Sequence, residues 1–277
     1  MIDIQNLHFS YRRKKVFDSL NLQFLPGHVY GLLGKNGTGK STLLRNIAGL
    51  LFPEKGNITV DGNNPARRQP RFLQNIFMVP EEFYLPNISI AQFLKHHAPF
   101  YTKFNKEQFE KYRALFELPA DNTMQNMSYG QKKKVLISFA LASNAKFLLM
   151  DEPTNGLDIM SKSQFRKVLA EALDGERCII ISTHQVKDLE NLIDRITIID
   201  EGKILFDQNV DEIARRLSFR HSFDNAEAKE AFYSESSLRG NVIVTPNETG
   251  DESKLDLELL YKAIVTNGEK VKTVFTS

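Results

Sequence analysis

The chain has 277 residues, of which 42% are hydrophobic, and a formal net charge of +2 at pH 7. This length suits one large domain or two modest ones with a substantial core, and the small net charge argues against a nucleic-acid-binding surface. Cys178 is the only cysteine, which excludes an intrachain disulfide and favours a buried thiol in a reducing compartment. No apolar stretch reaches about 18 residues and the N-terminus lacks the pattern of a signal peptide, so we expect a cytoplasmic protein.

Residues 1–30 have the alternating apolar pattern of β-strands and predict a β-rich edge that carries Tyr11 and Val16. A short basic run at residues 12–15 falls in the expected turn between two strands. A second run, the three lysines at residues 132–134, falls on an expected helix. We interpret both basic runs as solvated faces, because each is too short to suggest nucleic-acid contacts.

Residues 34–41 match the pattern G-x-x-x-x-G-K-S/T between an apolar run at 28–34 and a helical pattern at 40–50 that Pro53 stops. In this strand–loop–helix context, glycines allow close approach to phosphate, and the loop N–H groups and the helix N-terminus form an anion cradle. The lysine adds positive charge for the β- and γ-phosphates, and the serine hydroxyl is available to Mg²⁺. The sequence therefore predicts a nucleoside triphosphate site made of Gly34, Lys35, Asn36, Gly37, Thr38, Gly39, Lys40, Ser41 and Thr42.

The middle of the chain changes from strand patterns to helical patterns. Residues 56–62 read as a strand with a turn, whereas residues 88–145 lack apolar strand runs and place aromatic residues at helical spacing. We predict a helical subdomain over about 88–145, with most of its aromatic residues in the core. The preceding residues 83–85 either pack in that core or line a groove that receives a partner helix.

Two carboxylates end an apolar strand pattern. Asp151 follows the run at 147–150, which places it at the carboxyl edge of a parallel sheet, where open α/β folds bind ligands. This position suits a water-mediated contact with Mg²⁺, and the next residue, Glu152, is placed to polarise an attacking water. Further apolar runs at 178–182 and 196–200 alternate with helical segments, as such a sheet requires.

The order of these motifs resembles that of the ATP-binding cassette (ABC) ATPases. Residues 127–131 read Met-Ser-Tyr-Gly-Gln and resemble the family's signature Leu-Ser-Gly-Gly-Gln, and residues 155–158 resemble its D-loop. His184 follows an apolar run and resembles the switch histidine, and Tyr11 falls where the family's aromatic residue stacks on adenine. Five motifs in order make the resemblance specific over roughly residues 1–210.

The resemblance implies an α/β fold, namely a P-loop NTPase domain over residues 1–215 with a β-rich edge subdomain, a parallel-sheet core and a helical subdomain. It also implies ATP and Mg²⁺ as cofactors, with Val16 on the ribose side. In this family two cassettes stack head to tail around two ATP molecules. The residues that would contact the partner's ATP, cross the interface or hold the γ-phosphate are Ser128, Gly130, Gln131, Asp158 and His184.

Two positions depart from the family pattern. Tyr129 replaces the first glycine of the signature, and we expect function to survive because Gly130, at the sterically demanding approach to phosphate, is kept. Glu81 stands where most relatives have a glutamine that binds Mg²⁺ and senses the permease. Because a carboxylate is also a good Mg²⁺ ligand, we hypothesise a metal set of Ser41, Glu81 and Asp151. The alternative is that Glu81 is a solvated loop acid.

Residues 216–277 lie outside the resemblance. Residues 241–245 read as a strand, and a following segment has apolar residues at the i, i+3, i+4, i+7 spacing of an amphipathic helix. These apolar residues are Leu257, Leu260, Tyr261 and Ile264. We expect a small C-terminal α/β appendage that docks on the cassette, dimerises or regulates it.

These observations favour the ATPase subunit of an ABC transporter, peripheral on the cytoplasmic face of the membrane, which forms a homodimer and drives a separate transmembrane permease. The signature and its three lysines look most like those of bacterial exporter subunits. The alternatives are a soluble ABC ATPase that powers an assembly complex and a nucleotide-sensing module without turnover. Glu152 and His184 together disfavour the second alternative, and a single phosphate loop disfavours tandem cassettes.

Overall fold

The computed structural model describes residues 1–119, 123–189, 192–238, 240–248 and 252–275. A six-stranded sheet lies at the centre, in the order β5-β6-β7-β3-β8-β9. Its strands are β3 (Val29–Leu33), β5 (Ile76–Val79), β6 (Phe147–Asp151), β7 (Cys178–Thr183), β8 (Arg195–Asp200) and β9 (Lys203–Asn209). The first five strands of this order are parallel, and β9 pairs antiparallel with β8.

Both faces of the central sheet are covered, which explains why its strands read as continuous apolar runs. Successive side chains of a strand point to opposite faces. In β6, Phe147 and Leu149 belong to one core cluster, and Leu148 and Met150 belong to the other. Cys178 of β7 is buried, as expected, and burial raises the pKa of its thiol to about 12.

One face of the sheet packs against the N-terminal strands and the first helix. An antiparallel sheet in the order β2-β1-β4 contains β1 (Ile2–Tyr11), β2 (Lys14–Phe24) and β4 (Lys55–Val60), and it shares a core with α1 (Lys40–Ile47). The short helix α2 (Pro70–Leu73) precedes β5. The predicted helix at residues 40–50 is three residues too long at its end, because Gly49 has a left-handed φ of 65°.

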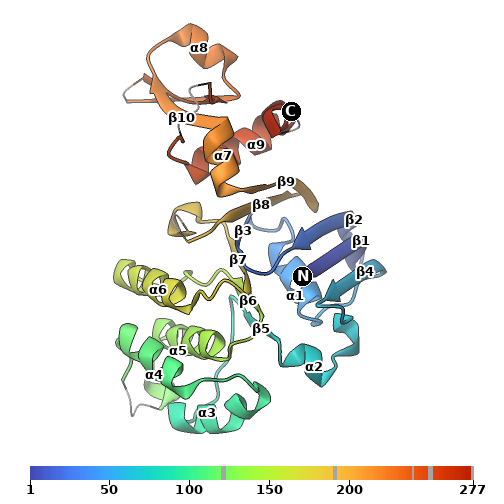
Figure 1. The fold of residues 1–277 in the computed structure, drawn as a ribbon, viewed down its shortest axis with the longest axis vertical. Helices are drawn as coiled ribbons and strands as arrows, with labels where there is room; N and C mark the ends of the chain where they lie inside the picture. Colours follow the sequence, from blue (N-terminus) through green and yellow to red (C-terminus); the bar gives the residue numbers. More distant parts are fainter. Residues whose placement is uncertain (120–122, 190–191, 239, 249–251, 276–277) are drawn as a thin grey trace.

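The other face carries the helices between β5 and β7. They are α3 (Ile90–His97), α4 (Lys106–Leu115), α5 (Tyr129–Ala142) and α6 (Ile159–Ala172). Figure 1 shows α3, α4 and α5 at one end of the molecule, away from the N-terminal strands. The aromatic residues Phe109, Tyr112 and Phe116 are buried in this part of the core, as their spacing predicts.

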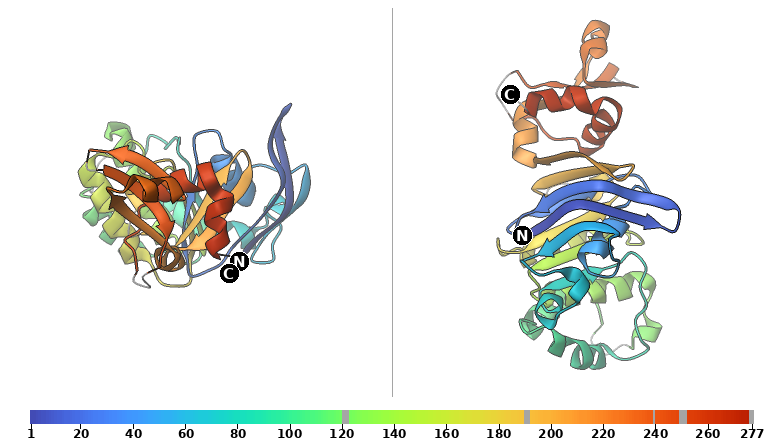
Figure 2. Two further views of the ribbon diagram at one scale, coloured as in Figure 1. Left: turned by 90° about the horizontal axis from the view of Figure 1, so that it is seen from above. Right: turned by 90° about the vertical axis from the view of Figure 1, so that its right-hand side faces the viewer.

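The C-terminal elements lie at the opposite end of the molecule, beyond β8 and β9 (Figures 1 and 2). They are α7 (Val210–Arg216), β10 (Leu217–Ser222), α8 (Asn225–Glu230), β11 (Tyr233–Ser237), β12 (Gly240–Pro246) and α9 (Leu257–Lys272). The strands form a separate antiparallel sheet in the order β10-β12-β11. Helix α9 contacts both this sheet and β9, so its apolar face is buried between them. Within the described residues, no helix has the length and apolar character needed to span a membrane.

Candidate functional site

A cavity of about 310 Å³ lies where the phosphate-loop pattern meets the N-terminal sheet and the end of β6. Its walls combine residues that are far apart in the sequence but were predicted to form one site. They are Tyr11, Lys14, Val16, Asn36, Gly37, Gly39, Lys40, Ser41, Thr42, Glu81 and Glu152. Lys14 is the one lining residue that the sequence analysis did not select.

The phosphate loop connects the carboxyl end of β3 to α1. Gly37 and Gly39 have φ values of 85° and 109°, which glycine adopts without strain. A Cβ atom at position 39 would lie 2.7 Å from the ring of Phe17, so the loop also needs glycine there for space. Thr38 donates its hydroxyl hydrogen to the Lys35 carbonyl at 2.9 Å, which closes the loop on itself.

Lys40 lies inside this loop and is almost fully buried. Its ammonium donates hydrogen bonds to the carbonyls of Gly34 at 2.7 Å and Lys35 at 3.1 Å, and its Nζ lies 3.8 Å from Glu152 Oε1. Burial lowers the pKa of Lys40, and the carboxylates of Glu152 and Asp151 oppose this shift. The two hydrogen bonds hold the end of the Lys40 side chain at the cavity wall, where it can bind phosphate.

Asp151 ends β6 and is completely buried. Its Oδ1 accepts hydrogen bonds from the hydroxyls of Ser41 at 2.9 Å and Ser182 at 2.6 Å. Its Oδ2 is buried and has no hydrogen-bond partner among the described residues. A buried, unpartnered carboxylate oxygen beside a serine hydroxyl fits a hard cation such as Mg²⁺.

No group of three His, Cys, Asp or Glu side chains within the described ranges is arranged to hold a metal ion. A cation beside Asp151 would therefore depend on the Ser41 hydroxyl, on Glu81 and on oxygens of a bound phosphate. This is the donor set that magnesium uses in phosphoryl-transfer sites, where protein side chains supply only some of the ligands.

Glu152 follows Asp151 in a left-handed backbone conformation, with φ of 46°. Its carboxylate turns toward the end of β7, where Oε1 accepts hydrogen bonds from the His184 amide at 3.0 Å and ring Nδ1 at 2.8 Å. Thr183 donates its hydroxyl hydrogen to Oε2 at 3.2 Å. The structure thus brings His184 into contact with Glu152, but His184 does not line this cavity and instead lines a neighbouring one with Gly34 and Lys35 of the phosphate loop.

Glu81 lies in the segment after β5, on the wall of the same cavity. Its Oε1 accepts a hydrogen bond from Asn155 Nδ2 at 2.8 Å, and its backbone carbonyl accepts one from the Tyr129 hydroxyl. A half-buried carboxylate with these contacts differs from a freely solvated loop acid. Both residues that depart from the family pattern, Glu81 and Tyr129, are therefore joined by a hydrogen bond.

The signature residues do not line this cavity. Ser128 caps α5, where its Oγ accepts a hydrogen bond from the Gln131 amide at 3.2 Å and its amide donates to Gln131 Oε1 at 2.9 Å. Gly130 lies in the first turn of the same helix. The N-terminus of α5, with its partial positive charge, is exposed and is not part of the wall of this cavity.

Asp158 is also outside the cavity and caps α6. It accepts hydrogen bonds from the Ser161 amide at 2.8 Å and hydroxyl at 2.9 Å, and these bonds lower the pKa of its carboxyl. The next two residues, Ile159 and Met160, are 84% and 71% exposed. Two exposed apolar residues beside Asp158 suggest a surface that another protein covers.

One interpretation of the sequence is wrong. The lysines at 132–134 were expected to form a solvated face, but Lys133 is completely buried. Helix α5 is buried on all sides from Val135 onward. Lys133 lies just before this stretch and donates hydrogen bonds to the carbonyls of Glu152 and Asn155, in the turn after β6. No local pattern distinguishes Lys133 from its two lysine neighbours, so the sequence offers no signal for its burial.

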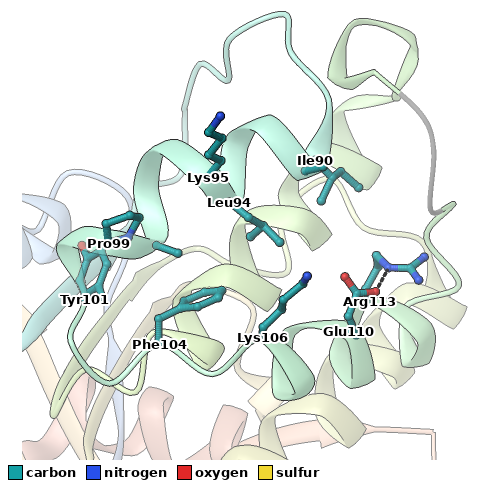
Figure 3. Close-up of a pocket in the computed structure, with 11 residues that line it drawn as sticks. Ile90, Leu94, Lys95, Pro99, Tyr101, Phe104, Lys106, Glu110 and Arg113 are labelled. Carbon is teal, nitrogen blue, oxygen red and sulfur yellow. Dashed lines mark hydrogen bonds and ion pairs between the residues drawn. The ribbon is translucent and has the colours of Figure 1, made fainter.

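A second cavity of about 690 Å³ lies between α3 and α4 and shares no residue with the first. Figure 3 shows Leu94, Phe104 and Lys106 around the space that this cavity occupies. The Glu110 carboxylate accepts a hydrogen bond from Arg113 Nε at 2.7 Å nearby. A third cavity, of about 730 Å³, shares Asn36 with the first and is also lined by Gly34, Lys35 and His184.

Comparison with known proteins gives consistent results. A family model described as "ABC transporter" matches residues 17–155. The chain is 30% identical over 226 residues to "SkfA peptide export ATP-binding protein SkfE" of Bacillus subtilis (strain 168), covering 79% of this chain and 94% of that protein. It is also 30% identical over 215 residues to "Lantibiotic transport ATP-binding protein SrtF" of Streptococcus pyogenes, covering 76% and 92% of the two chains.

Solved structures share the fold. "Structure of cbiO1 from clostridium perfringens: Part of the ABC transporter complex cbiONQ" has a TM-score of 0.63 and 28% identity, covering 76% of this chain and 89% of that one. "Structure of ATP binding subunit of ABC transporter" has a TM-score of 0.70 and 24% identity, covering 78% and 92% of the two chains. The arrangement of sheets and helices is therefore one that known proteins also adopt.

Proposed function

This chain belongs to the ABC transporter family and is an ATP-binding, ATP-hydrolysing subunit, and we propose that it works as a head-to-tail homodimer that drives a separate membrane permease. The proposal places it on the cytoplasmic face of the membrane. Export is the direction we favour, because two similar proteins are named for peptide export and for Nod factor export.

The observation that carries the dimer is that the site of one chain is incomplete. The phosphate loop lines the nucleotide cavity, whereas Ser128 and Gly130 lie outside it at the exposed start of α5. In a head-to-tail pair, each α5 N-terminus and its Ser128 hydroxyl would contact the γ-phosphate on the opposite chain, with Gln131 holding the capping box. Asp158 would meet the partner near its phosphate loop, and the exposed Ile159 and Met160 would be buried there.

Within one chain, the cavity residues divide the work of binding. Tyr11 provides a ring for adenine and Val16 a contact on the ribose side, while the loop amides and Lys40 hold the phosphates. Thr42 lies at the same wall, within 3.5 Å of the Tyr11 hydroxyl. Ser41, Asp151 and Glu81 would hold Mg²⁺, which neutralises phosphate charge when bound.

Glu152 is the proposed general base. Hydrogen bonds from Thr183 and His184 fix the orientation of its carboxylate. The carboxylate is therefore already positioned to orient a water molecule and to accept the proton of that water. His184 keeps its second ring nitrogen for the γ-phosphate. Release of the γ-phosphate would remove the contact between the two chains, and this opening would be transmitted to the permease.

The surface after β5 is a candidate for permease contact. Tyr84 is 86% exposed, and it lies three residues after Glu81 of the nucleotide cavity. Its neighbour Phe83 stacks on Tyr129 with ring centroids 5.0 Å apart. An exposed aromatic residue on a segment that reaches the cavity at one side suits a surface that senses the permease.

The Glu152→Gln variant tests this function. It keeps the shape of the site but lacks the base, so we expect it to accumulate as an ATP-bound dimer. The tagged variant would be expressed in its native host and purified with ATP from detergent-solubilised membranes. The matched control is Glu152→Gln combined with Lys40→Ala, which lacks the phosphate-binding ammonium and should recover little partner.

A membrane protein recovered in stoichiometric amount with Glu152→Gln, and not with the control, would support the transporter subunit and identify its permease. Recovery of a purely soluble partner, with nothing from the membrane fraction, would contradict the transport proposal and favour an assembly ATPase.

A further inference from the structure

Lys133 is a buried lysine that the chemistry described above does not use. It lies on α5, two residues after the signature, with no exposed surface. Its ammonium donates hydrogen bonds to the carbonyl of Glu152 at 2.8 Å and to that of Asn155 at 3.0 Å. One charged side chain thus joins the signature helix to the backbone of the proposed general base.

The segment that Lys133 holds is a strained turn. Glu152 has a φ of 46°, a conformation that costs energy for a residue with a Cβ atom. The Asn155 amide donates to the Glu152 carbonyl at 3.1 Å, so both carbonyls that Lys133 binds belong to this one turn. The same turn leads from β6 to Asp158, so its position affects both the base and the expected dimer contact.

The contacts around Lys133 extend to the other unusual residues. Its Nζ lies 5.7 Å from the centre of the Tyr129 ring, whose hydroxyl bonds the Glu81 carbonyl. Asn155 donates to the Glu81 carboxylate at 2.8 Å. Tyr129, Glu81 and Lys133 therefore form one connected cluster between the signature and the nucleotide cavity.

Electrostatics agree with this placement. Burial lowers the pKa of Lys133 to about 8, and the carboxylates of Glu81, Glu152 and Asp151 oppose the shift. A buried charge is costly unless it is well paired, and here its partners are two carbonyls and a ring face of the catalytic region.

We propose that Lys133 is a positioning residue that couples the signature helix to Glu152, so that contact of α5 with the partner's ATP orients the base acting on the chain's own ATP. This inference rests on the proposed function. It predicts that Lys133 affects hydrolysis and not ATP binding, because its side chain does not line the nucleotide cavity.

Steady-state ATPase, ATP affinity and thermal stability would be measured on the full chain with Lys133→Met and Lys133→Arg. Methionine fills similar volume but leaves the two carbonyls without the ammonium donor, so we expect the Tm to fall by a few degrees while the chain stays folded. We expect kcat to fall about tenfold or more while the Kd for ATP stays within about twofold. Arginine keeps the charge and the donors and should restore part of kcat.

The matched control is Lys132→Met. Lys132 is the preceding residue of the same helix, is partly exposed and makes no side-chain hydrogen bond or ion pair within the described ranges. Its kcat should match that of the wild type. Loss of activity in wild type and all variants would instead mean that the proposed function is wrong.

A double-mutant cycle with Ser128→Ala tests the coupling itself. If Lys133 relays the position of the signature helix, the double variant will be no slower than the slower single variant. If the fold-losses of kcat in the two single variants instead multiply in the double variant, the two residues act independently and the proposal is overturned. An unchanged kcat in Lys133→Met, equal losses of kcat and ATP affinity, or a Lys133→Met chain that does not fold would also overturn it.

Discussion

Glu81 illustrates how a single atom can change what a site requires. Its carboxylate brings a second negative charge to a cavity that already contains Glu152, close to the buried Asp151. That charge strengthens attraction for a divalent cation and weakens attraction for phosphate when no cation is present. Activity should therefore depend strongly on Mg²⁺.

Replacing Glu81 with glutamine should weaken the binding of Mg²⁺ while keeping the shape of the segment. We expect Glu81→Gln to need Mg²⁺ at a concentration higher by on the order of tenfold for half-maximal ATPase, because an amide oxygen is a poorer ligand. Glu82→Gln, at the exposed neighbouring position, is the control and should behave like wild type. An identical Mg²⁺ titration for Glu81→Gln would count against a role at the metal.

Residues of the nucleotide cavity could be predicted because short sequence motifs identify them. The phosphate loop and Asp151 each follow an apolar strand, so spacing alone places them at one edge of a sheet. Lys133 could not be found this way, since its neighbours are also lysines and its burial depends on a turn about twenty residues further along the chain. Lys14 belongs to the basic run that was interpreted as a solvated turn, but β2 begins at this residue and Lys14 lines the cavity.

At the scale of elements, the turn between β8 and β9 supports the strand that carries Val16. Gly202 lies in this turn with φ of 72°, and a Cβ atom there would lie 1.8 Å from the Val16 carbonyl oxygen. No side chain fits between them. The backbone of this turn therefore packs directly against Val16, which lines the nucleotide cavity.

The Gly202→Ala substitution should destabilise the chain through both strain and a clash. Gly62→Ala is the matched control, because Gly62 has φ of 75° but open space around its Cβ position. We expect the free energy of unfolding to fall by about 1 kcal/mol in the control and by about 3 kcal/mol or more in Gly202→Ala. Urea denaturation of both variants measures the difference. Equal losses in the free energy of unfolding would mean that the backbone near Val16 shifts to accept the added methyl group without destabilising the chain.

Element boundaries show where local patterns stop being informative. Strands β6 and β7 were predicted because both faces are apolar, which is the pattern of a covered parallel strand. The end of α1 was predicted late, since the periodicity continues through Leu50 while the backbone turns at Gly49. Periodicity reports which side of an element is apolar, whereas a boundary depends on a single residue's backbone conformation.

For the whole molecule, the C-terminal elements are packed on the cassette and share its core. Phe275 contacts Phe206 of β9 with ring centroids 5.2 Å apart, and the Arg216 guanidinium lies over the Phe275 ring. Buried residues of α9 belong to the same cluster as those of β8. We therefore infer that these elements and the cassette unfold together.

Phe275→Ala tests this cooperative unfolding. We expect calorimetry to show one transition in the wild type and in the variant, with the Tm lowered by about 3–6 °C in the variant because an apolar contact between the two parts is lost. Phe223→Ala is the control, since Phe223 is 82% exposed and should leave the Tm unchanged. Two separate transitions, with Phe275→Ala shifting neither, would show that the parts unfold independently.

The position of the signature outside the nucleotide cavity has a consequence for how fast the protein can work in dilute solution. If two copies must meet before either can hydrolyse ATP, the rate per molecule follows mass action and falls as the protein is diluted. A permease that binds both copies replaces their bulk concentration with a local one that is far higher. Free copies would then hydrolyse almost no ATP, and ATP would be consumed chiefly where two copies are held side by side.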